Sequence, residues 1–500
     1  MNDNQPEKLR KHTNVYLIIS VVMNVIIFSF CSTTSPLYAF CDESHVFFNV
    51  GKAILKGKVL YRDILEQKGI LIYLIQIPAY LISHTNFTGV WLIEIFLLSL
   101  CVYYLYKIAY QISKSDICAL FSTVVWGGIV FTSQALASGQ IAEVYLLPCF
   151  SFSLYSMAVV FYEQNTLNHL QLFLNGIMAG IILWTKYSLL GFYFAFGIAI
   201  LINGTINRQT KKAIKDALVY ISGIVAVTIP CVLYFAVNHA LSDLINAYLI
   251  NNISSYGNAI SLKGTLLGYY DTVIWELRWS PLFFCSLVIS AFCILIFGNK
   301  QSKYYLLLMG IFQYLFVFSH GAMFNYYLFA FAVFVIFGVA YFSKFLAHLI
   351  KRLKIKCYSL KIAATVGICV ISVITAFDYK PFPNEFLKNK YDLAQYQFAK
   401  IMNSETEKPT LMQYDSMDAG FFTAADIVPS TWAYCKLNVK NDAMVQDQLN
   451  TIKNKSVDYI VLSAQSTVPD ILDENYELEA EKSQIVVNAP VTWRLYKRRK

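Results

Sequence analysis

The chain has 500 residues, of which 57% are hydrophobic, 16% aromatic and only 14% charged, and its net charge is +9. Because an ordinary soluble domain is about 25% charged, this composition excludes a soluble enzyme, a disordered chain and a fibrous repeat. The charge is uneven, since residues 1–377 hold 25 Lys and Arg against 14 Asp and Glu, whereas residues 378–500 hold 15 against 17. We therefore predict a basic, α-helical membrane domain over 1–377 and a small outer domain over 378–500. Membrane topology explains the basic balance, which implies no nucleic-acid partner.

Apolar stretches of near-bilayer length recur through the first 377 residues. The first, 14–34, is too long for the apolar core of a signal peptide, so we expect it to anchor the chain. A span needs ~20 residues, and about eleven such spans are predicted, at 14–34, 90–110, 117–136, 143–162, 170–186, 187–204, 217–238, 281–298, 303–319, 326–346 and 361–377.

The first outer loop, 35–89, begins with two adjacent carboxylates, Asp42 and Glu43. Acids are scarce in the membrane domain, so their positions are informative. A pair at the membrane surface can supply a general base or hold a divalent cation. The alternative is a solvated pair of loop acids without a role.

The same loop is basic, which runs against the positive-inside tendency. An anionic ligand such as a phosphate would offset this charge, although long outer loops also tolerate lysines. The segment 46–55 has helical spacing, and we expect it to lie on the membrane surface with lysines snorkelling from its edge. The basic residues of the loop are Lys52, Lys56, Lys58, Arg62 and Lys68.

A further apolar run, 70–83, is only ~14 residues long, which is typical of an interfacial or re-entrant segment. If the N-terminus is cytoplasmic and this run does not span, the basic loops around 208–215 and 351–356 also face the cytoplasm. Counting the run as a span would invert every later loop. We therefore predict a multi-pass plasma-membrane protein whose C-terminal domain is extracytoplasmic.

Later polar residues gather at the outer ends of the predicted spans. Glu143 opens one span, and Lys186 ends another before a tight turn. Lys186 can meet a phosphate as a point charge, or it can simply snorkel to the interface. His320, Asn325 and Tyr326 form a third outer cluster between two late spans.

Residues 378–500 alternate strand-like and helix-like segments, which predicts a small α/β domain. The expected strands are 410–413, 459–463, 483–488 and 492–497, and the expected helices are 391–402 and 443–453.

Taken in order, these motifs resemble the GT-C superfamily of polyprenyl-phosphate-sugar-dependent glycosyltransferases, in particular protein O-mannosyltransferases and aminoarabinose transferases. The resemblance covers most of 14–346. The proline that the family has after Lys68 is replaced by Gly69-Ile70. The matching segments are Asp42-Glu43, 57–63 with Tyr61 and Asp63, Lys68-Gly69, Glu143 with Pro148, Thr185-Lys186 and Asn325-Tyr326-Tyr327.

The resemblance implies that an acceptor hydroxyl attacks the anomeric carbon of a lipid-linked sugar at the outer face. This reaction needs a base for the hydroxyl and positive charge for the departing phosphate. Asp42 is the expected base, with Glu43 or Glu143 orienting the acceptor or a divalent cation. Lys68 and Lys186 are expected to bind the phosphate. The remaining expected substrate-binding residues are Tyr61, Asp63, His320, Asn325 and Tyr326.

Two other functions stay open at this point, as does the acceptor, which can be a lipid, a protein or a cell-wall glycan. A flippase of a lipid-linked sugar predicts ionisable groups near the bilayer midplane and two related halves. A glycan polymerase or ligase predicts a later outer loop rich in Arg and His. The loop 239–280 holds only His239, Lys263 and Arg278.

Overall fold

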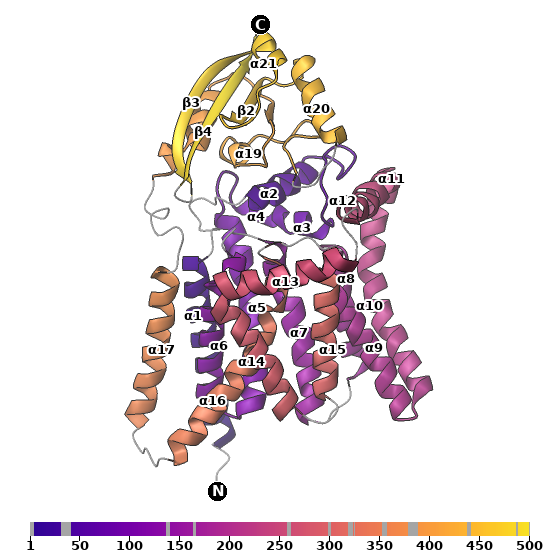
Figure 1. Ribbon diagram of the computed structural model, residues 1–500, viewed down its shortest axis with the longest axis vertical. Coiled ribbons are helices and arrows are strands. Elements are labelled where there is room, and N and C mark those ends of the chain that lie inside the picture. The colour runs from indigo at the N-terminus through magenta and orange to yellow at the C-terminus, as the bar shows by residue number, and fades with distance from the viewer. Residues whose placement is uncertain are drawn as a thin grey trace.

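The computed structural model of the chain describes residues 5–31, 42–136, 141–163, 167–257, 262–298, 302–318, 324, 326–352, 358–378, 389–437, 442–486 and 489–499. An upright helical bundle forms the lower part, short helices lie across its top, and a sheet with its own helices caps the molecule (Figure 1). The C-terminus lies at the sheet end and the N-terminus at the opposite end (Figure 1).

Every predicted span coincides with a helix of the bundle. Helices α5, α7, α10 and the continuous pair η4–α16 are long and apolar enough to cross a membrane. The other helices of the bundle have shorter apolar stretches or belong to a bent pair. The chain is thus a mostly helical multi-pass membrane protein, while the count of eleven spans stays a prediction. The bundle consists of α1 (Gln5–Cys31), α5 (Thr88–Ser113), α6 (Asp116–Phe131), α7 (Ala142–Glu163), α8 (His169–Leu183), α9 (Gly191–Ile206), α10 (Thr210–Val237), α14 (Pro281–Phe297), α15 (Ser302–Val317), η4 (Tyr327–Phe334), α16 (Val335–Arg352) and α17 (Tyr358–Asp378).

Helix α10 illustrates why these segments belong in lipid. Past its basic first turns, most of its exposed positions are apolar, as at Leu218, Ile229 and Val237. In water such a face would carry polar residues. Inside the bundle, by contrast, polar groups find partners, as where Trp126 donates from Nε1 to the Ala332 carbonyl at 2.8 Å.

The short helices between bundle and sheet come from the two loops 35–89 and 239–280. The apolar run 70–83 breaks into two short helices that pack against α2 and α5, which supports its predicted exclusion from the spans. These helices are α2 (Asp42–Leu55), α3 (Leu71–Leu74), α4 (Gln76–Ile82), α11 (Leu241–Leu244), the π-helical turn η3 (Ile245–Ile250), α12 (Asn251–Gly257) and α13 (Leu262–Trp279).

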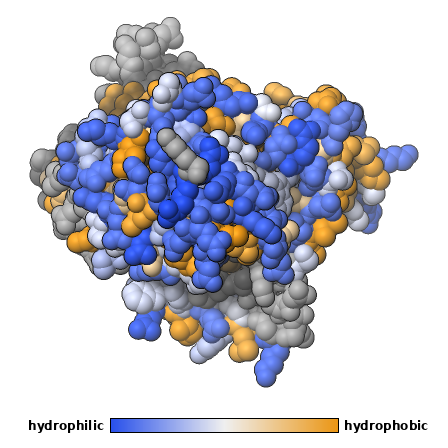
Figure 2. Space-filling model, turned by 90° about the horizontal axis from the view of Figure 1, so that it is seen from above, coloured by the Kyte–Doolittle hydropathy of each residue, from blue (hydrophilic) through white to orange (hydrophobic). Residues whose placement is uncertain are grey.

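A four-stranded sheet lies in the C-terminal part, as the sequence predicts. Its order is β1-β2-β4-β3, with β1 parallel to β2 and the other pairs antiparallel. Seen from above, this part presents mainly hydrophilic residues, with hydrophobic ones toward the rim (Figure 2). Its elements are α18 (Ala394–Met402), β1 (Leu411–Gln413), α19 (Phe421–Ala424), α20 (Asp442–Lys453), β2 (Tyr459–Ser463), α21 (Asp470–Asn475), β3 (Tyr476–Val486) and β4 (Ala489–Arg498).

Helix α2 is covered by this C-terminal part, and one apolar core joins Phe47 and Val50 to Phe421 and other residues of 393–495. The prediction that the lysines of α2 snorkel at the membrane surface is wrong for Lys52. Its side chain is 0% exposed and donates to the Phe422 carbonyl at 2.9 Å.

Candidate active site

Two lysine–carboxylate pairs lie where the loop 35–89 meets the bundle. Lys68 Nζ lies 3.2 Å from Glu43 Oε1, and Lys186 Nζ lies 2.5 Å from Glu143 Oε1. Glu43 sits in the first turn of α2 and Glu143 in the first turn of α7. The sequence singled out all four residues, and the structure pairs them.

Backbone hydrogen bonds bring the segments that carry the two lysines together into one site. The Gly69 N–H donates to the Thr185 carbonyl at 3.0 Å, and the Leu71 N–H donates to the Trp184 carbonyl at 3.1 Å. The segment after Lys68 therefore runs beside the segment that ends in Lys186, and Glu143 contributes to the electrostatic field at Lys68.

Position 69 holds a glycine for a structural reason. A Cβ on this residue would lie 2.1 Å from the Trp184 carbonyl oxygen, closer than any van der Waals contact. A proline would also remove the N–H that bonds Thr185. Glycine here permits the close approach of the two lysine-bearing segments.

Both ammonium groups face aromatic rings, an arrangement that favours a cation. Lys68 Nζ lies 4.8 Å from the Phe47 ring centroid. Lys186 Nζ lies 4.8 Å from the Tyr326 ring and 5.1 Å from the Tyr327 ring. The structure thus brings Tyr326 of the predicted late cluster to Lys186.

Electrostatics keep Lys68 charged. Burial alone would lower the pKa of Lys68, but the carboxylates of Glu43 and Glu66 outweigh it and raise that pKa above its ordinary value. Lys68 therefore carries a full positive charge at neutral pH.

Glu66 is a buried carboxylate that the sequence did not single out. It accepts a hydrogen bond from the Tyr73 hydroxyl. Burial raises the pKa of Glu66, although Lys68 and the Tyr73 hydroxyl favour its charged form. Its position two residues before Lys68 was the available signal, because alternate residues of an extended segment face the same side.

Two other predicted residues act within the loop. Tyr61 is buried, takes a left-handed φ of 67°, stacks on Phe235 and donates from its hydroxyl to the Lys68 carbonyl at 2.5 Å. It thereby holds the backbone that carries Lys68. The Asp63 carboxylate closes the turn 59–63 by accepting from the Val59 N–H at 2.8 Å, and it forms an ion pair with Arg62.

Comparison with known proteins identifies the fold. No protein-family model and no curated protein sequence matches the chain. The crystal structure of ArnT from Cupriavidus metallidurans bound to undecaprenyl phosphate matches with a TM-score of 0.56 and 10% identity, over 96% of this chain and 97% of that one. The apo structure of the same protein matches with a TM-score of 0.54 and 11% identity, over 97% and 98%.

The chain has the ArnT fold. Because ArnT is a member of the GT-C superfamily, the GT-C resemblance is confirmed for the fold. The matched length shows that the ArnT fold takes in the C-terminal sheet as well as the bundle.

Part of the predicted site lies outside what the structure describes. Asp42 begins α2, one residue before Glu43, but its side chain is not among the described ones. His320 and Asn325 lie outside the described residues altogether.

The predicted divalent cation finds no ready site among the described side chains. Within them, no three His, Cys, Asp or Glu residues gather closely enough to hold a metal. Glu43 and Glu143 each face a lysine instead.

Proposed function

We propose that the chain is an integral-membrane glycosyltransferase that moves a sugar from a polyprenyl-phosphate donor to an acceptor hydroxyl at the outer face. One observation carries the proposal: two lysines, each beside a carboxylate, meet through backbone bonds at the top of an ArnT fold. An ArnT structure with this fold contains undecaprenyl phosphate. A lipid phosphate is an anion that lysine ammonium groups bind.

Lys68 and Lys186 stabilise the departing phosphate. As the bond between the anomeric carbon and the phosphate oxygen breaks, negative charge grows on that oxygen, and fixed positive groups lower the barrier. Glu43 and Glu143 hold the lysines in place before the donor arrives. Arrangement in advance is what makes such electrostatic stabilisation effective.

Glu143 also offers a place for a hydroxyl. Its side chain is 1% exposed, and its Oε2 atom has no hydrogen-bond partner among the described residues. A buried carboxylate oxygen without a donor is uncommon in a native protein. A sugar or acceptor hydroxyl would supply the missing donor.

Asp42 is the proposed base. It takes the proton of the acceptor hydroxyl as that oxygen bonds to the anomeric carbon, and the polyprenyl phosphate leaves. Glu43 follows it on the first turn of α2 and ties that turn to Lys68. The base and the phosphate-binding lysine are therefore linked through a single helix end.

The Asp42→Asn variant tests this role. We expect transfer from a polyprenyl-phosphate sugar, assayed in membranes, to fall by about 10²–10⁴-fold, the usual contribution of a general base. The matched control is Asp271→Asn, since Asp271 is an exposed acid on α13. Undiminished transfer by a folded, inserted Asp42→Asn protein would exclude Asp42 as the base.

A further inference from the structure

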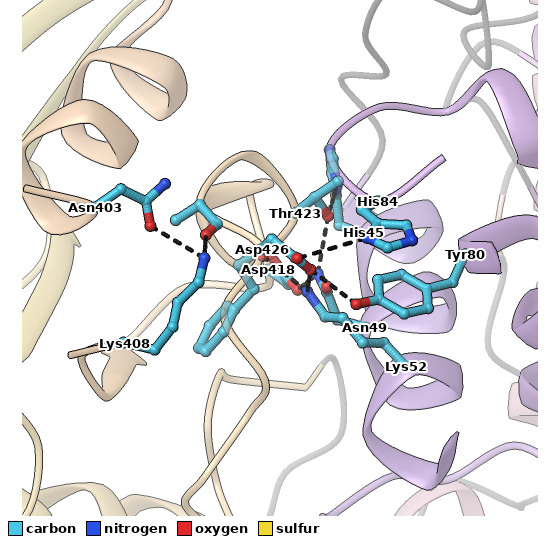
Figure 3. Close-up of polar contacts among 12 residues, drawn as sticks. His45, Asn49, Lys52, Tyr80, His84, Asn403, Lys408, Asp418, Thr423 and Asp426 are labelled. Carbon is cyan, nitrogen blue, oxygen red and sulfur yellow. Dashed lines mark hydrogen bonds and ion pairs between the residues drawn. The ribbon is translucent and has the colours of Figure 1, made fainter. Parts of the chain in front are cut away.

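Helix α2 has two opposite polar faces. Glu43 and Phe47 contact Lys68 on one face. His45, Asn49 and Lys52 recur at helical spacing on the other, because 3.6 residues make one turn. The second face points into the C-terminal part of the chain (Figure 3).

Specific hydrogen bonds join this second face to residues 418–426 (Figure 3). We call the residues that make these contacts the docking cluster: His45, Asn49 and Lys52 of α2 with Asp418, Phe422, Thr423 and Asp426. Asn49 Nδ2 donates to Asp418 Oδ2 at 2.7 Å and to Thr423 Oγ1 at 3.0 Å. His45 Nδ1 lies 3.0 Å from the same Thr423 oxygen. Lys52 Nζ donates to the Phe422 carbonyl and lies 3.8 Å from Asp426 Oδ1.

The docking cluster is buried, so its polar groups lose their hydration when the two parts associate. Asn49, Lys52 and Asp418 are all 0% exposed. An apolar interface of the same area would hold two parts of a protein together at least as strongly, because burying charges has a desolvation cost. Directional polar contacts instead fix one relative placement of the two parts.

The C-terminal part also contacts the loop that carries Lys68, the partner of Glu43. The Leu65 N–H donates to the Trp432 carbonyl at 2.9 Å, and Trp432 Nε1 donates to the Tyr61 carbonyl at 3.0 Å. Tyr61 in turn bonds the Lys68 carbonyl. One part of the chain therefore fixes both α2 and the loop that faces it.

We propose that Asn49, Lys52 and Asp418 are positioning residues for the transfer reaction. Docked through them, the C-terminal part sets the position of α2 and so of Asp42 and Glu43 at its first turn. This inference rests on the proposed function, because the reaction defines what is being positioned.

The charges around Lys52 favour a fixed position of α2 relative to residues 418–426. Burial, opposed by Asp426 and Asp418, lowers the pKa of Lys52 to about 7. Burial raises the pKa of Asp418 to about 6, against the Gly420 N–H, Asn49 and Lys52. Each group depends on the other to remain charged while buried.

The test compares the kinetics of sugar transfer with amide hydrogen exchange of α2, both measured in the full-length protein. In Asp418→Leu we expect kcat for transfer to fall at least tenfold, while KM for the donor stays within twofold, because the lysines that bind phosphate are not in the cluster. Backbone amides of α2 should exchange hydrogen at least tenfold faster, with β2 and β4 unchanged. Asp418→Asn keeps the shape and one of the two acceptor oxygens, so it should change kcat and α2 exchange less than Asp418→Leu does.

A matched control removes a buried hydrogen bond elsewhere in the C-terminal part. Tyr476 donates from its hydroxyl to the Val457 carbonyl at 3.0 Å, away from α2. Tyr476→Phe should leave kcat and α2 exchange unchanged. If Asp418→Leu does not fold, Lys52→Met, which keeps the apolar stem, should show the same split between kcat and KM.

Two results would overturn the positioning role. The first is an unchanged kcat in a folded variant whose α2 exchanges faster. The second is an equal loss of kcat in Tyr476→Phe, which would reveal a general effect of domain stability. If the unaltered protein transfers no sugar, the proposed function fails instead, and unchanged α2 exchange in Asp418→Leu would separately refute the docking.

Discussion

Single residues decide how closely the two lysine-bearing segments approach. The sequence correctly singled out Glu43, Lys68, Glu143 and Lys186, because charge is rare in an apolar chain. It could not predict their pairing, since the partners lie 25 and 43 residues apart. Glu66 was missed because its burial depends on the fold around it.

Gly69→Ala tests the close approach directly. The added Cβ would meet the carbonyl oxygen and carbon of Trp184 at 2.1 and 2.3 Å, and both atoms belong to the backbone. We expect a loss of about 1–3 kcal/mol in stability, as for other overpacked sites, seen as a lower Tm in detergent. Gly310→Ala is the control, because nothing lies within 4 Å of its Cβ position. An unchanged Tm for Gly69→Ala would contradict the packing described.

The Lys186–Glu143 pair tests phosphate binding. Removing Lys186 alone would strand a buried carboxylate at a cost of about 3–5 kcal/mol, so the informative variant is Lys186→Met/Glu143→Gln. We expect it to fold and to bind undecaprenyl phosphate at least tenfold more weakly, measured with purified protein. Lys344→Met, which changes an exposed lysine of α16, should bind normally. Full affinity in the double variant would remove Lys186 from the site.

At the scale of elements, the sequence predicts best where burial follows local pattern. The strands and the main helices of 389–499 lie close to their predicted positions. The first half of β3 was missed, because Glu477, Glu479 and Glu481 give an acidic segment, as is common on an edge strand. The surface role predicted for α2 failed because its cover comes from residues about 370 positions away.

Helix α13 shows a different reason for failure. It lies within the loop 239–280, and its polar Thr272 and Glu276 are buried while Leu277 and other apolar residues are exposed. A helix that buries polar residues while exposing apolar ones does not match a soluble amphipathic helix. The pattern can be interpreted only once α13 is seen to lie across the top of the bundle (Figure 1).

The docking cluster predicts a particular pH dependence. The pKa of Lys52 falls from 10.5 to about 7 on folding, so the unfolded chain binds more protons between these values and stability rises with pH there. The pKa of Asp418 rises from 3.8 to about 6, so stability falls as pH rises through that window. Each slope is at most about 1.4 kcal/mol per pH unit. The groups that act on Lys52 are Asp418, Asp426 and Lys408, together with the Tyr80 ring. His84 lies 3.8 Å from Asp426, and His45 contacts Thr423.

We therefore expect a minimum in stability between pH 6 and 7, followed by a rise toward pH 10, in Tm measured across pH. Lys52→Met should flatten the rise above pH 7, because it removes the group that titrates. An identical rise in wild type and Lys52→Met would assign the pH dependence to other groups.

At the scale of the whole molecule, hydropathy was enough to place the helices, because the bilayer fixes their length. It was not enough to show that the C-terminal part packs on α2, since apolar contacts across such distances leave no local pattern. The match to the ArnT structure covers both parts, although the two chains are only 10% identical in sequence. The fold is thus specified by burial and length rather than by any long run of shared residues.

The fate of a lipid-linked sugar tests the central claim most directly. The full-length protein is placed in liposomes with a polyprenyl-phosphate sugar and a mixture of candidate acceptors, and free polyprenyl phosphate is measured together with donor movement between leaflets. We predict that free polyprenyl phosphate and a glycosylated acceptor appear in equal amounts, and that Asp42→Asn abolishes both. Movement of intact donor across the bilayer without cleavage would contradict the account and identify a flippase.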